Sequence, residues 1–195
     1  PGTQSIITMA HKGMKYDSDG EYYKAGVMNY VFGGAFNSRL NLNLREDKGF
    51  TYGIRSNFQG NDTDGMFYIS TSVRAEATDS AITEIYKELD GYLADGITSE
   101  ELAFTKSSIA NSDALKYETS FQKSRFLSRI QRYGLDGSYT KKQNMVLNSL
   151  SVNDINALAK KYLDGDNHIV VVVGNKYSLK SKLAKFGKVT EIKIK

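Results

Sequence analysis

The chain has 195 residues, of which 40% are hydrophobic and 25% charged, a balance typical of one globular domain with a sizeable core. It contains no cysteine, which excludes disulfides, thiolate metal sites and a cysteine nucleophile. The net charge of +4 lies near the C-terminus: seven lysines against Glu191 give residues 176 to 195 a charge of +6, so the rest carries −2. These lysines do not alternate with aromatic residues, so they indicate a solvated surface and not a nucleic-acid interface.

The ends and the hydropathy of the chain bear on its surroundings. No apolar run approaches the ~20 residues of a membrane span, so no membrane partner is expected. The chain begins with Pro1 and not with Met, which indicates a segment of a longer protein. We expect residues 1 to 195 to form a single domain, and both the bacterial periplasm and the cytoplasm stay open as its compartment.

The first third of the chain predicts a strand, two helices and a hairpin. Residues 5 to 10 are β-prone, and the helical spacing that starts at residue 22 ends at Gly33 and Gly34. A second helix is predicted from Ser38 as N-cap to residue 48, with Gly49 as its left-handed exit. The segments 52 to 58 and 66 to 74 read as strands, and the glycine-rich loop between them predicts a hairpin.

The remainder of the chain is mostly helical. Helices are predicted over residues 78 to 95, from the capping box at residues 98 to 101 onward through 121 to 133, and from Ser151 to residue 162. The apolar run at 168 to 173 predicts a strand covered on both faces or central in its sheet. A short helix at 176 to 186 and an edge strand at 188 to 194 follow. The expected fold class is α+β in two layers, with a mixed or antiparallel sheet and helices packed on one face.

Several site motifs are absent from the sequence. The two histidines, His11 and His168, are far apart, and neither H-E-x-x-H nor H-x-x-E-H is present to offer metal ligands. The aspartate-rich turns at 17 to 20 and 62 to 65 place their glycine too early for a calcium loop. No G-x-S-x-G segment exists, so no serine stands out as a nucleophile. We expect no metal site and no cofactor within this chain.

The stretch NLREDKGFTYG, residues 43 to 53, places Arg45 seven positions before Tyr52 across the turn at Gly49. If Arg45 ends a helix and Tyr52 begins the returning strand, both side chains are long enough to reach one region beyond the turn. An ordinary explanation also exists, because an arginine near a helix C-terminus interacts favourably with the helix dipole. On spacing alone, that structural role is the better interpretation.

A family resemblance adds to this interpretation. The segments VFGGAFNSRL (31 to 40) and NLREDKGFTY (43 to 52) resemble the second, non-zinc half of the insulinase/pitrilysin family of inverzincin metallopeptidases. The resemblance implies a processing-peptidase-like C-terminal domain that faces a zinc-binding H-x-x-E-H half, in the same parent chain or on a separate subunit, around a bound peptide.

The resemblance also implies roles for particular residues. Arg45 would hold a carbonyl of the peptide, and Tyr52 would donate its phenolic hydrogen to the oxyanion that forms during cleavage. Phe50, Phe36 and Tyr30 would line apolar substrate subsites, although a core role is the better interpretation of each ring. Zinc is expected in the partner half, so this chain is not expected to hydrolyse peptides alone.

Two alternative functions stay open from the sequence. The chain would serve as a catalytically inactive scaffold or assembly subunit of the same fold if neither the parent gene nor its neighbour encodes H-x-x-E-H. Alternatively, the lysine-rich tail would bind nucleic acid, which predicts a steep dependence of binding on salt. The intact pair of Arg45 and Tyr52 favours the peptidase interpretation.

Overall fold

The structure is a computed structural model that describes residues 3–115 and 117–192. Its strands are β1 (Gln4–Lys12), β2 (Thr51–Gly60), β3 (Gly65–Arg74) and β4 (Ile169–Val173). Its α-helices are α1 (Glu21–Asn29), α2 (Arg39–Asn41), α3 (Thr78–Asp95), α4 (Ser99–Leu115), α5 (Ser120–Tyr133), α6 (Tyr139–Ser149), α7 (Val152–Tyr162) and α8 (Lys176–Leu183). Two π-helical turns, η1 (Tyr30–Gly34) and η2 (Leu42–Asp47), and two 3₁₀ turns, η3 (Ala75–Ala77) and η4 (Ala184–Phe186), complete the elements.

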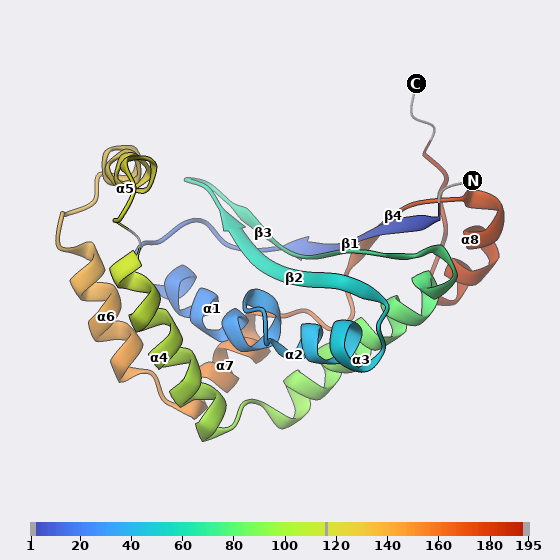
Figure 1. The fold of residues 1–195 in the computed structure, drawn as a ribbon, viewed down its shortest axis with the longest axis horizontal. Coiled ribbons are helices and arrows are strands. Elements are labelled where there is room, and N and C mark those ends of the chain that lie inside the picture. The colour runs from blue at the N-terminus through green and yellow to red at the C-terminus, as the bar shows by residue number, and fades with distance from the viewer. Residues whose placement is uncertain (1–2, 116, 193–195) are drawn as a thin grey trace.

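The four strands form one open sheet in the order β2-β3-β1-β4, and every pairing is antiparallel. Figure 1 shows α1, α2, α3 and α7 beneath this sheet, while none of the described helices covers the opposite face. The α+β architecture with helices packed on one face is therefore confirmed, and the sheet is antiparallel. Within the described residues, no helix is long and apolar enough to cross a membrane.

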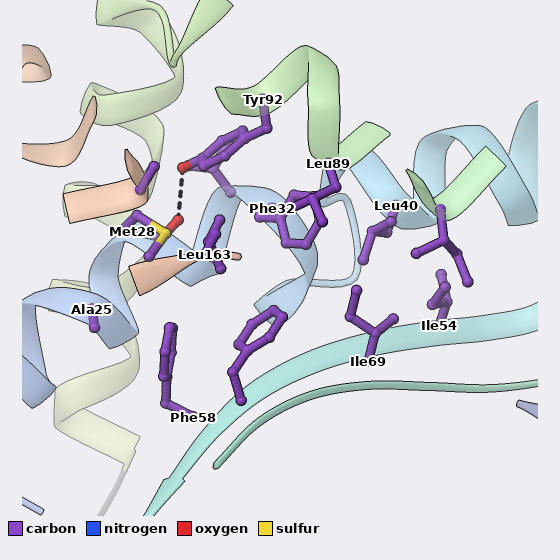
Figure 2. Close-up of a cluster of buried hydrophobic side chains, with 14 of the residues drawn as sticks. Ala25, Met28, Phe32, Leu40, Ile54, Phe58, Ile69, Leu89, Tyr92 and Leu163 are labelled. Carbon is purple, nitrogen blue, oxygen red and sulfur yellow. Dashed lines mark hydrogen bonds between the residues drawn. The ribbon is translucent and has the colours of Figure 1, made fainter. Parts of the chain in front are cut away.

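The core lies between the sheet and the helices. Alternate residues of the central strands point toward the helices and are buried, such as Ile7 on β1 and Ile69 on β3. Figure 2 shows the facing helical side chains, including Phe32 and Tyr92, gathered over the strand residues. The Tyr92 hydroxyl donates to the carbonyl of Met28 at 2.9 Å, which satisfies a polar group that burial would otherwise leave unpaired.

Locally encoded elements match their predictions. The helix predicted over 78 to 95 is α3, and Gly96 ends it with a positive φ of 70°. The capping box of α4 is formed, since Glu101 N–H donates to Thr98 Oγ1 at 3.2 Å and Thr98 N–H donates to the Glu101 carboxylate at 2.8 Å. Ser151 caps α7 in the same way. The predicted continuous helix up to residue 133 is wrong, because α5 is a separate helix with its own capping box.

Two strand predictions near the C-terminus need correction. The run at 168 to 173 is neither central nor covered on both faces: β4 is an edge strand, and Ile169 is 73% and Val173 54% exposed. An apolar run shows that a segment prefers a strand, but its position in the sheet depends on residues far away in the sequence. The predicted strand at 188 to 194 is absent from residues 188 to 192, and its last two positions lie outside the described residues.

Candidate functional site

The segment that carries Arg45 is one helical run, formed by α2 and η2. Leu40 and Leu44 are fully buried in the core and fix the inner face of this run. Its last turn is π-helical, with Lys48 N–H donating to the carbonyl of Asn43 at 2.9 Å. Gly49 then adopts a φ of +60°, as predicted for the exit of the helix. The chain therefore reverses sharply between Arg45 and β2.

Ser38 precedes this run at the predicted N-cap position, but its side chain makes no capping hydrogen bond, so this part of the prediction is wrong. Its hydroxyl instead accepts a hydrogen bond from Asn41 Nδ2 at 3.2 Å. The η2 turn is also tied to α3, because Asn43 Nδ2 donates to the carboxylates of Glu84 at 2.9 Å and Glu88 at 2.7 Å. Polar contacts of side chains therefore supplement the buried leucines in fixing the run.

Arg39 links the run to α4, a role that the sequence interpretation missed. Its guanidinium makes two parallel hydrogen bonds with the Glu101 carboxylate, at 2.8 and 2.7 Å, and also donates to the carbonyl of Gly96 at 2.7 Å. Burial raises the pKa of Glu101, but the bonds from Arg39 outweigh it and hold that pKa below its ordinary value. Arg39 and Glu101 lie 62 positions apart in the sequence, so no local pattern indicates that they pair.

The Arg45 side chain is engaged locally. Its guanidinium lies 4.1 Å from the centroid of the Phe36 ring, in a cation–π arrangement. Nη1 lies 2.6 Å from a carboxylate oxygen of Glu46, yet this buried nitrogen makes no well-oriented hydrogen bond. The Phe36 ring itself is 60% exposed. The Arg45 side chain, 29% exposed, is therefore held between an aromatic ring and a carboxylate, and its guanidinium has no hydrogen-bond partner among the other described residues.

Tyr52 stands on a β-bulge at the start of β2. Thr51 is paired with Val73 but Ile54 with Thr71, so Tyr52 and Gly53 together oppose the single residue between them on β3. The Tyr52 side chain is 94% exposed, and no hydrogen bond to its hydroxyl occurs within the part of the chain that the structure describes. Its phenol is consequently free to donate to a ligand.

Hydrogen bonds of threonine hydroxyls fix the bulge, both within β2 and to β3. Gly53 N–H donates to Thr51 Oγ1 at 3.0 Å, and the Thr71 hydroxyl lies 3.0 Å from the carbonyl of Gly53. The Thr51 hydroxyl donates to the carbonyl of Ser72 at 2.7 Å. These bonds satisfy the backbone groups that the irregular ladder leaves unpaired, so the bulge is a defined feature of β2.

The predicted site residues are only partly brought together. Phe36 and Arg45 are in contact, whereas Phe50 is half-buried and packs against the core. Over residues 3–115 and 117–192, no hydrogen bond, ion pair or ring contact joins Arg45 to Tyr52. Arg45 and Tyr52 lie on either side of the turn at Gly49. Arg45 contacts Phe36 and Glu46, whereas Tyr52 is exposed.

An apolar hollow adjoins the loop that carries Phe36. It has a volume of about 280 Å³ and is lined by η1, α2, the start of η2 and α4. Ala35 and Asn37, the neighbours of Phe36, line it, as do the half-exposed side chains of Leu42 and Phe104. The size of this hollow suits a single side chain better than a whole ligand, since ligand pockets usually measure about 300–1,000 Å³.

The described residues offer no site for a metal ion, and the resemblance assigns the zinc ion to the partner half. They contain no group of three or more histidine, cysteine, aspartate or glutamate side chains that could hold a metal ion. The rings of His11 and His168, far apart in sequence, do lie 5.2 Å apart between centroids. Burial, and then the charge of His11, lowers the pKa of His168, whose two ring nitrogens have no hydrogen-bond partner among the described residues.

Comparisons with known proteins agree with this architecture. A protein from Bacillus subtilis described as an uncharacterized zinc protease is 27% identical over 175 residues, which are 87% of this chain and 41% of the relative. A Helicobacter pylori protein described as a non-peptidase homolog is 27% identical over 78% of this chain and 35% of its own length. The chain thus spans about two fifths or less of these relatives.

Solved structures and a family model point the same way. The crystal structure of a peptidase M16 inactive domain from Pseudomonas fluorescens superposes with a TM-score of 0.79 at 27% identity, covering 88% of this chain and 40% of that one. A Helicobacter pylori protease gives 0.75 at 16% identity, over 88% of this chain and 41% of that one. The model of the family described as the peptidase M16 inactive domain matches residues 1–109, more than half of the sequence. This chain therefore belongs to the peptidase M16 inactive-domain family.

Proposed function

We propose that this chain is the substrate-contacting, non-zinc half of a two-half M16 metallopeptidase, and that Arg45 and Tyr52 contact a peptide held between the halves. The observation that carries the proposal is the Tyr52 phenol, 94% exposed and without a hydrogen-bond partner among the described residues, on a bulge built by several hydrogen bonds. By contrast, the buried hydroxyl of Tyr92 has a role within the fold, because it donates to the carbonyl of Met28.

The proposed chemistry assigns one task to each side chain. Tyr52 donates its hydroxyl hydrogen to the oxyanion that develops during attack on the peptide carbonyl, where one donor is worth about 3–4 kcal/mol. Arg45 donates to a neighbouring carbonyl of the peptide while its guanidinium stays on the Phe36 ring. The attacking water comes from the zinc-binding H-x-x-E-H half, which lies in the parent chain or on another subunit.

The substrate subsites follow from the exposed apolar groups beside Arg45. Phe36 and the hollow next to it would accept one apolar side chain of the peptide. Phe50, half-buried against the core, would offer only the exposed part of its side chain. Because the main chain of an extended peptide supplies most contacts in such a mode, selectivity for sequence should be loose.

The second candidate function is a catalytically inactive scaffold of the same fold. The family description as an inactive domain and the non-peptidase description of the Helicobacter pylori relative favour it over a cleaving assembly. The existing contacts of Arg45 with Phe36 and Glu46 agree with it as well. Both candidates share the coarser function, a domain that pairs with another half and has no metal site among its described residues.

A peptidase assay separates the two candidates. The chain is assayed on a fluorogenic peptide alone, and then within its complete parent protein or together with the H-x-x-E-H subunit, loaded with zinc. We expect no cleavage by the chain alone and cleavage by the complete assembly. A stable assembly that binds zinc but cleaves no peptide from a broad library would establish the scaffold function instead.

A further inference from the structure

The outer edge of β2 is occupied by side chains from the helical layer. The Tyr22 hydroxyl donates to the carbonyl of Phe58 at 2.8 Å, and Asn29 Nδ2 donates to the carbonyl of Ser56 at 2.8 Å. Asn41 takes the next position along this edge, at Ile54. Backbone groups of three alternate residues of β2 are thus hydrogen-bonded to side chains. Such cover keeps an edge strand from pairing with another chain.

Asn41 makes the most complete of these contacts. Its Nδ2 donates to the carbonyl of Ile54 at 2.8 Å, and its Oδ1 accepts from Ile54 N–H at 3.1 Å. The same Nδ2 also lies 3.1 Å from the carbonyl of Ala35 and 3.2 Å from Ser38 Oγ. The residue is 2% exposed. Asn41 therefore replaces both bonds that a neighbouring strand would give to Ile54.

The position of Asn41 connects the two residues of the proposed site. It lies one helical turn before Arg45 in the run formed by α2 and η2, and it binds the first residue of β2 after the bulge that carries Tyr52. The bulge is held on its β3 side by the threonine hydroxyls and on its outer edge by Asn41. A displacement of Ile54 would therefore move the phenol relative to the guanidinium.

We infer that Asn41 is a positioning residue, which fixes the strand that carries Tyr52 to the helix that carries Arg45 and so sets the spacing of the two side chains. This inference rests on the proposed function for its effect on catalysis. Without the Asn41 amide, the buried N–H and C=O of Ile54 lose their partners, and β2 shifts to find others. Small displacements of catalytic groups, on the order of 1 Å, cost about 100-fold in rate.

The test compares Asn41→Ala with a matched control, Asn29→Ala, in the complete zinc-loaded assembly. Asn29 is also buried and bonded to the same strand edge, but two residues further from the bulge. We expect both variants to lower the melting temperature by similar amounts, and only Asn41→Ala to lower kcat by about 10- to 100-fold with a smaller change in KM. Equal kcat values in the two variants would assign Asn41 a merely structural role.

A double variant tests whether Asn41 acts through Tyr52. In a background of Tyr52→Phe, the change Asn41→Ala should lower kcat little further, because the contact that it positions has already been removed. Losses that multiply would show that Asn41 affects rate by another route and overturn the inference. If Asn41→Ala fails to fold, Asn41→Leu replaces it in every comparison, since it removes both bonds to Ile54 while filling about the same space.

A readout without catalysis separates this inference from the proposed function. Hydrogen exchange is measured on the same preparations at the amide of Ile54, which should exchange much faster in Asn41→Ala and unchanged in Asn29→Ala. Unchanged exchange at Ile54 would reject the positioning role whatever the kinetics show. If instead Ile54 responds as expected while Tyr52→Phe leaves kcat unaltered, the proposed role of Tyr52 fails and the structural link stands.

Discussion

At the scale of single residues, the Tyr52 hydroxyl is the group whose removal should affect chemistry most. In a complete assembly, Tyr52→Phe should lower kcat by about 100- to 1,000-fold and change KM far less, because the donor acts mainly on the transition state. Steady-state kinetics on one peptide measure both constants. Tyr177→Phe, at another highly exposed tyrosine on α8, serves as the control and should leave both unchanged. An unaltered kcat in Tyr52→Phe would count against the assigned role.

His168 makes a second prediction, on stability and pH. It packs against His11 of β1, the ring of Tyr86 of α3, and the loop that holds Asp164 and Asp166, and burial lowers its pKa below the ordinary value near 6.5. The imidazole of His168 therefore binds a proton less readily in the folded protein than in the unfolded chain. The free energy of unfolding should therefore fall as the pH drops from about 6.5 toward the lower pKa of the folded state.

Urea denaturation between pH 8 and 5 measures this effect. In His168→Gln the fall in unfolding free energy over this range should be shallower than in the original protein, because the side chain no longer titrates. Identical slopes would mean that other groups carry the pH dependence.

Whether the contacts of a residue could be predicted depended on how far apart in the sequence the interacting residues lie. The segment from Ser38 to Tyr52 indicated Arg45 and Tyr52 because both belong to one short, recognisable pattern. The contact of Asn41 with Ile54 spans 13 positions, and that of Arg39 with Glu101 spans 62, and neither leaves a local signal. Residues that fix the backbone through distant partners are for this reason harder to predict from a sequence than residues that belong to one short pattern.

At the scale of elements, the turn between η2 and β2 depends on Gly49. Its φ of +60° lies in the left-handed region, while a Cβ added at this position would meet only open space. Gly49→Ala should therefore lower the unfolding free energy by about 1 kcal/mol through backbone strain alone. Gly91→Ala, in the middle of α3 and also in open space, should raise it by about 0.5–1 kcal/mol. Chemical denaturation of the two variants gives the comparison, and a stabilising Gly49→Ala would contradict the assigned conformation.

The elements that were predicted correctly are those that short-range chemistry defines. The capping boxes of α4 and α7, the glycine at the end of α3 and the β2–β3 hairpin all depend on residues within a few positions of one another. The place of β4 in the sheet depends on its pairing with β1, more than 150 positions earlier. The bulge at Tyr52 was not predicted either, because it lies in the pairing of β2 with β3, and the residue that follows it is bound by the Asn41 side chain.

At the scale of the whole molecule, one core includes residues from β1 near the N-terminus to Phe186 near the end. We propose that the 195 residues fold as a single domain. Thermal unfolding followed by far-ultraviolet circular dichroism and by tyrosine fluorescence should then give one coincident transition. Two separate transitions would show that the region around α5, which has no buried residue, unfolds independently.

The central claim is that a peptide lies against Tyr52, and a photocrosslink tests this without requiring catalysis. A benzoylphenylalanine is placed at position 52 of the complete assembly, or, as a control, at position 121, where Phe121 of α5 is exposed. Helix α5 lies near the hairpin end of β2, and its Tyr133 stacks on Tyr16. We predict that irradiation with a bound, labelled peptide gives adducts from position 52 and none from position 121. Labelled peptide that binds but forms no adduct at position 52 would contradict the account.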